Sequence, residues 1–188
     1  LLDNQKVWVI DGNHDYRLTG LLRRPWSKGV ETGGFVKRHN HFADQESGFL
    51  VIGLNSAGTG ILARGYVPLS EIGRLLNEAA SAVVPGRPSY RIALVHHHLL
   101  PLPEEPNELR GPAGNAQSMI FDDGTKLLKN AALVTQRLLE AKFDLVLHGH
   151  EHQSFGAVLR HTDGQATRMM TVLGGIDAAH GFQVIRFS

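Results

Sequence analysis

The sequence predicts an α/β fold. Short apolar runs rich in β-branched residues alternate with stretches of helical periodicity, as in sheets whose parallel strands are joined by helices. The 188 residues are 42% hydrophobic and 20% charged, which is typical of a globular chain. Because this length suits one domain and no linker or repeat divides the chain, we expect residues 1–188 to form a single domain, with no second domain.

The same periodicity predicts the individual elements. Apolar runs that end in polar or glycine-rich turns predict strands at 7–10, 49–54, 91–95 and 143–147, and a last strand at 182–187. Runs at 155–161 and 167–173 around an Asp163-Gly164 turn predict an antiparallel hairpin. A second helix is expected within 124–142, and a functional loop within 101–124. The first helix is expected to have Ser70 as its N-cap and Ile72, Leu75, Leu76, Ala79, Ala80 and Val83 on one face.

Charge and composition exclude several classes of function. The chain has 19 Lys and Arg against 18 Asp and Glu, a net charge of +1, so it lacks the basic excess that attracts nucleic acid. It has no cysteine, which excludes a disulfide framework, a cysteine-ligated metal and a thiol nucleophile. No apolar run approaches the roughly 20 residues that span a bilayer, and no signal-peptide pattern opens the sequence. We therefore expect a cytoplasmic protein without a membrane partner.

Metal-binding side chains follow three of the predicted strands at the point where each strand ends. Because the carboxyl ends of parallel strands meet at one edge of a sheet, we expect these side chains to converge. Imidazole together with amide and carboxylate oxygen suits zinc, manganese, iron or nickel better than calcium. The segments are Gly12-Asn13-His14-Asp15, His96-His97-His98 and His148-Gly149-His150-Glu151-His152.

These segments, in this order, resemble the later motifs of the calcineurin-like metallophosphoesterases, and the resemblance covers nearly the whole chain. It implies an α/β/β/α sandwich that holds two divalent ions, of Mn, Fe, Zn or Ni, and hydrolyses phosphate esters. It implies that Asn13, His96 and His150 ligate one ion and His152 the other. His96 is preferred to His97 as the ligand, although the sequence leaves the choice open. The resemblance further implies that His14 and Asp15 are catalytic and that Asn13, His14 and His97 bind substrate.

The first two motifs of that family are absent. An Asp-x-His and a Gly-Asp-x-x-Asp or Asn would precede Gly12, where this sequence has only 11 residues and neither motif. In the family those motifs supply the aspartate that bridges both ions. We therefore expect the chain to be the larger, C-terminal part of a longer protein, without the N-terminal strands of the sandwich.

The resemblance implies a hydrolase acting on phosphoric ester bonds of a small molecule, either a phosphodiester or a phosphomonoester. The expected mechanism is attack on phosphorus by a hydroxide that bridges the two ions, with His14 as the general acid that protonates the leaving oxygen. A nuclease of the same superfamily is a second reading, which the near-neutral charge disfavours. An alternative from another class of function is a non-catalytic binding or scaffold module that retains the fold. The sequence does not predict the oligomeric state.

Overall fold

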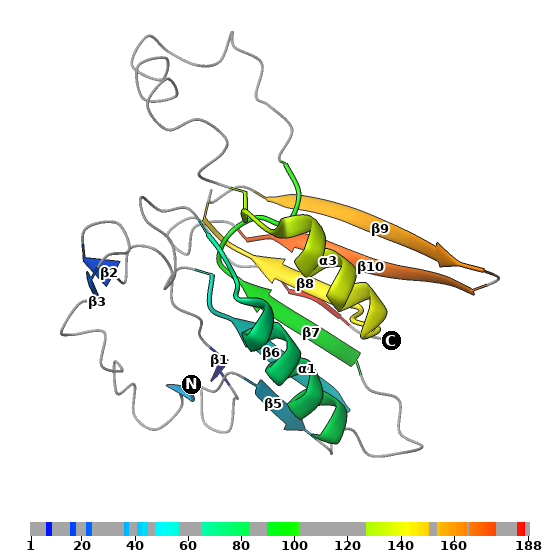
Figure 1. Ribbon diagram of the computed structural model, residues 1–188, viewed down its shortest axis with the longest axis horizontal. Helices are drawn as coiled ribbons and strands as arrows, with labels where there is room; N and C mark the ends of the chain where they lie inside the picture. The colour runs from blue at the N-terminus through cyan, green and yellow to red at the C-terminus, as the bar shows by residue number, and fades with distance from the viewer. Residues whose placement is uncertain are drawn as a thin grey trace, which may run out of the picture.

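The computed structural model describes residues 7–8, 16–17, 22–23, 36–37, 41–44, 48–56, 65–82, 90–101, 127–150, 154–164, 166–175 and 184–186. Its main feature is a six-stranded mixed sheet with the order β5-β6-β7-β8-β10-β9 (Figure 1). The strands are β5 (His41–Asp44), β6 (Phe49–Leu54), β7 (Tyr90–Val95), β8 (Leu145–His148), β9 (Phe155–Asp163) and β10 (Ala166–Gly174). Strands β6, β7, β8 and β10 are parallel, and β5 and β9 run antiparallel at the edges. The predicted α/β class is confirmed.

Two short strand pairs lie outside this sheet. Strand β1 (Val7–Trp8) pairs in parallel with β4 (Val36–Lys37), and β2 (Tyr16–Arg17) pairs antiparallel with β3 (Leu22–Arg23). Strand β1 covers the first half of the strand predicted at 7–10, and residues 9–10 lie outside the described residues.

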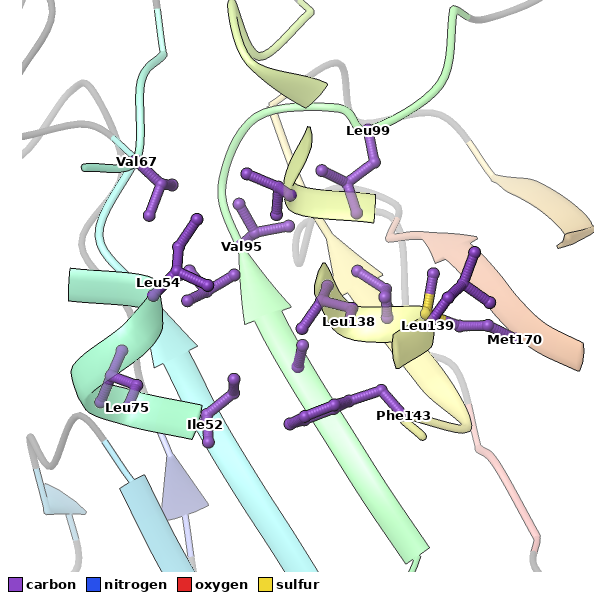
Figure 2. Packing of buried hydrophobic residues seen from close by; sticks show 14 of the residues in the cluster. Ile52, Leu54, Val67, Leu75, Val95, Leu99, Leu138, Leu139, Phe143 and Met170 are labelled. Atoms are coloured by element: carbon purple, nitrogen blue, oxygen red, sulfur yellow. The ribbon is translucent and has the colours of Figure 1, made fainter. Parts of the chain in front are cut away.

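Helices α1 (Leu69–Ala82) and α3 (Ala131–Glu140) cover the same face of the sheet (Figure 1). The order β6-β7-β8 explains this placement. The chain steps across the sheet in one direction, and crossovers of the same hand put both helices on one side. Figure 2 shows the core between the layers, to which α1 contributes Leu75, α3 contributes Leu138 and β6 contributes Ile52. All three are fully buried.

The other face of the sheet is also buried at its centre. Val51, Ile92 and Leu145 are 5%, 9% and 4% exposed and form a second cluster. Partly buried Leu94 and Ile185 pack against it. Strands buried on both faces have no polar side to alternate with, which explains why the sequence shows them as continuous apolar runs.

The first helix begins earlier than expected. α1 starts at Leu69, so Ser70 lies in its first turn and the predicted N-cap is wrong. The carbonyl of Pro68 accepts the N–H groups of Glu71 and Ile72 at 3.0 and 3.1 Å, which sets the helix start one residue before the serine. The predicted face is otherwise confirmed at Ile72, Leu75 and Ala79, whereas Ala80 is exposed.

The second helix begins later than expected. Leu127 forms a parallel β-bridge with His98, and the N–H of Leu128 donates to the carbonyl of His98 at 2.9 Å. Asn130 stands at the N-cap position, but its side chain does not cap the helix. Its amide group instead accepts a hydrogen bond from the N–H of Val67 and donates one to the carbonyl of Val67. These contacts hold 127–130 out of the helix, so α3 forms only over Ala131–Glu140.

Helix α3 ends in a Schellman motif that leads into β8. Lys142 has a left-handed φ of 60°. Its N–H donates to the carbonyl of Leu139, and the N–H of Phe143 donates to that of Leu138, both at 3.0 Å. Phe143 is 2% exposed and joins the same core as Leu138. This turn therefore fixes the point at which β8 enters the sheet.

The predicted hairpin is confirmed as β9 and β10, which pair antiparallel with Gly164 at a φ of 59° in the turn. The last strand, predicted at 182–187, is wrong in its described part, because residues 184–186 adopt no strand. Ile185 packs on the second face of the sheet, which needs no strand pairing. In the described part of the chain no helix has the length and hydropathy that a membrane crossing requires.

Leu75→Ala is expected to lower the free energy of unfolding by about 2–5 kcal/mol, because it leaves a cavity at a position with no solvent exposure. Urea unfolding measures the change. The matched control is Leu69→Ala on the same helix, where the side chain is 48% exposed and the expected loss is under about 0.5 kcal/mol. Equal losses in the two variants would contradict the described packing of α1.

Candidate functional site

The carboxyl ends of three parallel strands are level with one another. Leu54 pairs with Val95, and Val95 pairs with His148. The residues that follow these positions therefore leave the sheet at one edge. They include Ser56 after β6, His96 and His97 after β7, and His150 after β8.

His96 and His150 form the closest contact at this edge. Nε2 of His96 lies 3.0 Å from Nδ1 of His150, and the two rings meet edge to face with centroids 4.9 Å apart. The N–H of Gly149 donates to the carbonyl of His96 at 3.2 Å, which continues the β7–β8 pairing beyond the strands. His150 adopts a left-handed φ of 80°, which is uncommon outside glycine. The backbone thus turns sharply at the residue whose ring meets His96.

His97 is held from two sides. Its ring is 1% exposed, its Nδ1 lies 2.9 Å from Oγ of Ser56, and its own N–H donates to the same Oγ at 3.2 Å. A Cβ at Gly65 would overlap Cγ of His97, so only glycine fits at this position. The ring centroid of His97 lies 5.0 Å from that of His96 and 4.8 Å from that of His150. The three rings form one cluster.

A second pair of imidazoles lies beside this cluster. His98 and His148 are 2% and 4% exposed, with ring centroids 4.3 Å apart. Burial lowers the pKa of His148 below the ordinary histidine value of 6.5, and a hydrogen bond with the carbonyl of Gly149 opposes this shift only in part. His148 is therefore neutral near pH 7, in a position set by strand β8.

The nitrogen pair of His96 and His150 is compatible with a shared cation. Nitrogen ligands bind divalent zinc at about 2.0–2.1 Å, so two of them stand about 3.3–3.4 Å apart at the tetrahedral angle that zinc prefers and about 2.8–3.0 Å apart at a right angle. The observed separation of 3.0 Å fits a right angle at a shared ion, and it also fits an N–H···N hydrogen bond in the absence of an ion. Among the described residues, no group of three or more His, Cys, Asp or Glu side chains is arranged to hold a metal. Two imidazole nitrogen atoms are fewer ligands than a divalent ion needs, so a metal site at this edge would require further ligands.

The structure brings together three of the residues singled out from the sequence, namely His96, His97 and His150. The remaining predicted site residues, Asn13, His14, Asp15 and His152, lie outside the described residues, as does nearly all of the loop at 101–124.

Sequence reasoning missed Ser56 and Gly65, which fix the ring of His97. A signal for Ser56 was present, because it stands two residues after a predicted strand at the same sheet edge as the histidines. Gly65 had no such signal, since its role depends on a contact with a ring 32 positions along the chain, which is visible only once the fold is known.

Comparison with known proteins adds no family assignment. No protein-family model matches this chain, and no curated protein matches it.

His148→Leu is expected to make stability less sensitive to acid. The native state favours neutral His148, whereas the unfolded chain takes up a proton near the ordinary value of 6.5, so this residue costs stability as the pH falls through 6.5. Urea unfolding of the wild type and the variant with a chelator present, at about pH 8 and about pH 5.5, measures the difference. Equal acid sensitivity in the two proteins would show that His148 is not kept neutral by burial.

Proposed function

We propose that this chain belongs to a metal-dependent phosphoesterase of the calcineurin-like type. The observation that carries the proposal is the pairing of His96 and His150. These residues are 54 positions apart, yet their ring nitrogens stand 3.0 Å apart at the carboxyl edge of a parallel sheet. Two imidazole lone pairs that face each other are stable only with a proton or a cation between them. The metal ligands in this proposal are Asn13, His96 and His150 for one ion and His152 for the other.

The layers of the fold support the sandwich part of the proposal. Helices cover one face of the sheet, and Val51, Ile92 and Leu145 are buried on the other face. A sheet buried on both faces fits a fold with more than two layers. We propose that this fold is the α/β/β/α sandwich of the metallophosphoesterases.

The protein residues divide the chemistry among them. Two divalent ions, when bound, lower the pKa of a water molecule and offset the negative charge of the phosphate. In this proposal His97, whose ring lies beside those of His96 and His150, donates a hydrogen bond to a phosphate oxygen. His14 protonates the leaving oxygen, and Asp15 orients an imidazole of the site. The net charge of +1 favours a small phosphodiester or phosphomonoester over a long nucleic acid.

The first test is hydrolysis of bis-p-nitrophenyl phosphate by the full-length protein with manganese, before and after chelation. We expect hydrolysis that the chelator abolishes. His96→Gln and His150→Gln should each lower it by more than the roughly 10–100-fold that loss of an outer-shell partner costs.

The matched control is His161→Gln. His161 lies on β9, six residues and roughly 20 Å beyond Phe155, where the strand begins. Its substitution should leave the rate of hydrolysis unchanged. Absence of chelator-sensitive hydrolysis in the full-length protein would contradict the proposal and favour a non-catalytic binding module.

His14→Ala is expected to retain the metal and to lose turnover by roughly 10²–10⁴-fold, the usual contribution of a general acid. Metal content by elemental analysis and kcat by single-substrate kinetics separate the two effects. An unchanged kcat would remove His14 from the mechanism, and a parallel loss of metal would make it a ligand instead.

A further inference from the structure

Ser56 touches His97 through one hydroxyl group at two points. Its Oγ lies 2.9 Å from Nδ1 of the ring and 3.2 Å from the main-chain nitrogen of the same residue. Ser56 is 0% exposed. Its carbonyl accepts the N–H of Tyr66 at 3.1 Å, which ties it to the segment that carries Gly65. The hydroxyl therefore has no access to water and a fixed position beside the ring.

The count of hydrogens decides the direction of these bonds. The main-chain N–H of His97 can only donate, so Oγ accepts there. If Nδ1 also carried a proton, Oγ would accept twice, and the hydroxyl hydrogen would be buried with no acceptor among the described residues. An unsatisfied buried donor is costly. The hydroxyl therefore donates to Nδ1, and the proton of the neutral ring sits on Nε2.

We propose that Ser56 is a positioning residue that fixes His97 as the Nε2-protonated tautomer and thereby makes it a hydrogen-bond donor to a phosphate oxygen rather than a metal ligand. The part that concerns phosphate rests on the proposed function. Neither nitrogen of His97 is able to coordinate a cation in this state. The lone pair of Nδ1 accepts the hydroxyl of Ser56, and Nε2 carries a hydrogen.

The two adjacent histidines thus divide into different roles. Nε2 of His96 faces Nδ1 of His150, whereas Nδ1 of His97 faces Ser56 on the neighbouring strand end. Gly65 supports this division. A Cβ there would lie 2.5 Å from Nδ1 of His97, so the ring packs directly against the backbone of Gly65 on the side of Nδ1. The N–H of Lys129 donates to the carbonyl of Gly65 at 2.9 Å and holds that backbone in place.

The tautomer is measured directly by long-range ¹H–¹⁵N correlation NMR on the full-length protein labelled with ¹⁵N-histidine, with His97 assigned by its loss in His97→Gln. We expect Nε2 to be protonated and Nδ1 to be unprotonated. Ser56→Ala should abolish this preference, and Ser56→Thr, which keeps a hydroxyl, should retain it. A wild-type ring protonated on Nδ1, or an unchanged tautomer in Ser56→Ala, would overturn the proposal. The tautomer of His97 measured in the wild-type protein tests the proposal even if a variant fails to fold.

A titration with inorganic phosphate in the presence of zinc tests the donor role. Phosphate should shift the Nε2 signal of His97, and Ser56→Ala should weaken phosphate binding by about 10- to 100-fold, the value of a hydrogen bond to a charged group. Zinc binding measured by calorimetry should stay unchanged in that variant. Loss of zinc in Ser56→Ala, or a His97 signal that phosphate does not move, would overturn the donor role. The tautomer of His97 is measured without metal and without turnover. A failed hydrolysis assay would therefore contradict the proposed function and leave the result on the tautomer unchanged.

Discussion

The register of the parallel strands is the constraint on which the rest of the site depends. Leu54, Val95 and His148 stand side by side at the ends of β6, β7 and β8. Side chains from three distant stretches of chain meet because these strands stop at one level. A shift by one residue would turn every side chain of a strand to the opposite face. Burial of both faces of the sheet makes such a shift costly, so the packing of the core also fixes the histidine cluster.

The convergence of His96, His97 and His150 could be predicted from the sequence because strand ends are visible there. Each apolar run stops where polar residues begin, and parallel strands share a carboxyl edge. The roles that we propose for His96 and His97 were not accessible in this way. It depends on Ser56, 41 positions away along the chain, and on the close approach of Gly65. Contacts of this kind follow from tertiary packing and leave no periodic pattern.

The helix boundaries show the same limit in simpler form. Ser70 has the residue type of an N-cap, yet the carbonyl of Pro68 determines where α1 begins. Leu127 lies within the second predicted helix, at 124–142, but it bridges to His98 instead. In the first case a main-chain carbonyl one residue before the helix sets the boundary, and in the second a contact with a distant segment does so. The bridge to His98 also anchors the chain directly after the histidines, so the same departure from the expected helix stabilises the site edge.

The left-handed backbone at His150 has a consequence for any attempt to replace the imidazole at this edge. At a φ of 80° asparagine and aspartate are tolerated better than most residues, and β-branched residues are strongly disfavoured. Exchange of the imidazole for the short side chain of asparagine or aspartate would therefore add less backbone strain at this position than most other substitutions. Substitutions that introduce an oxygen donor at this edge would therefore begin at residue 150, and would leave position 65 as glycine.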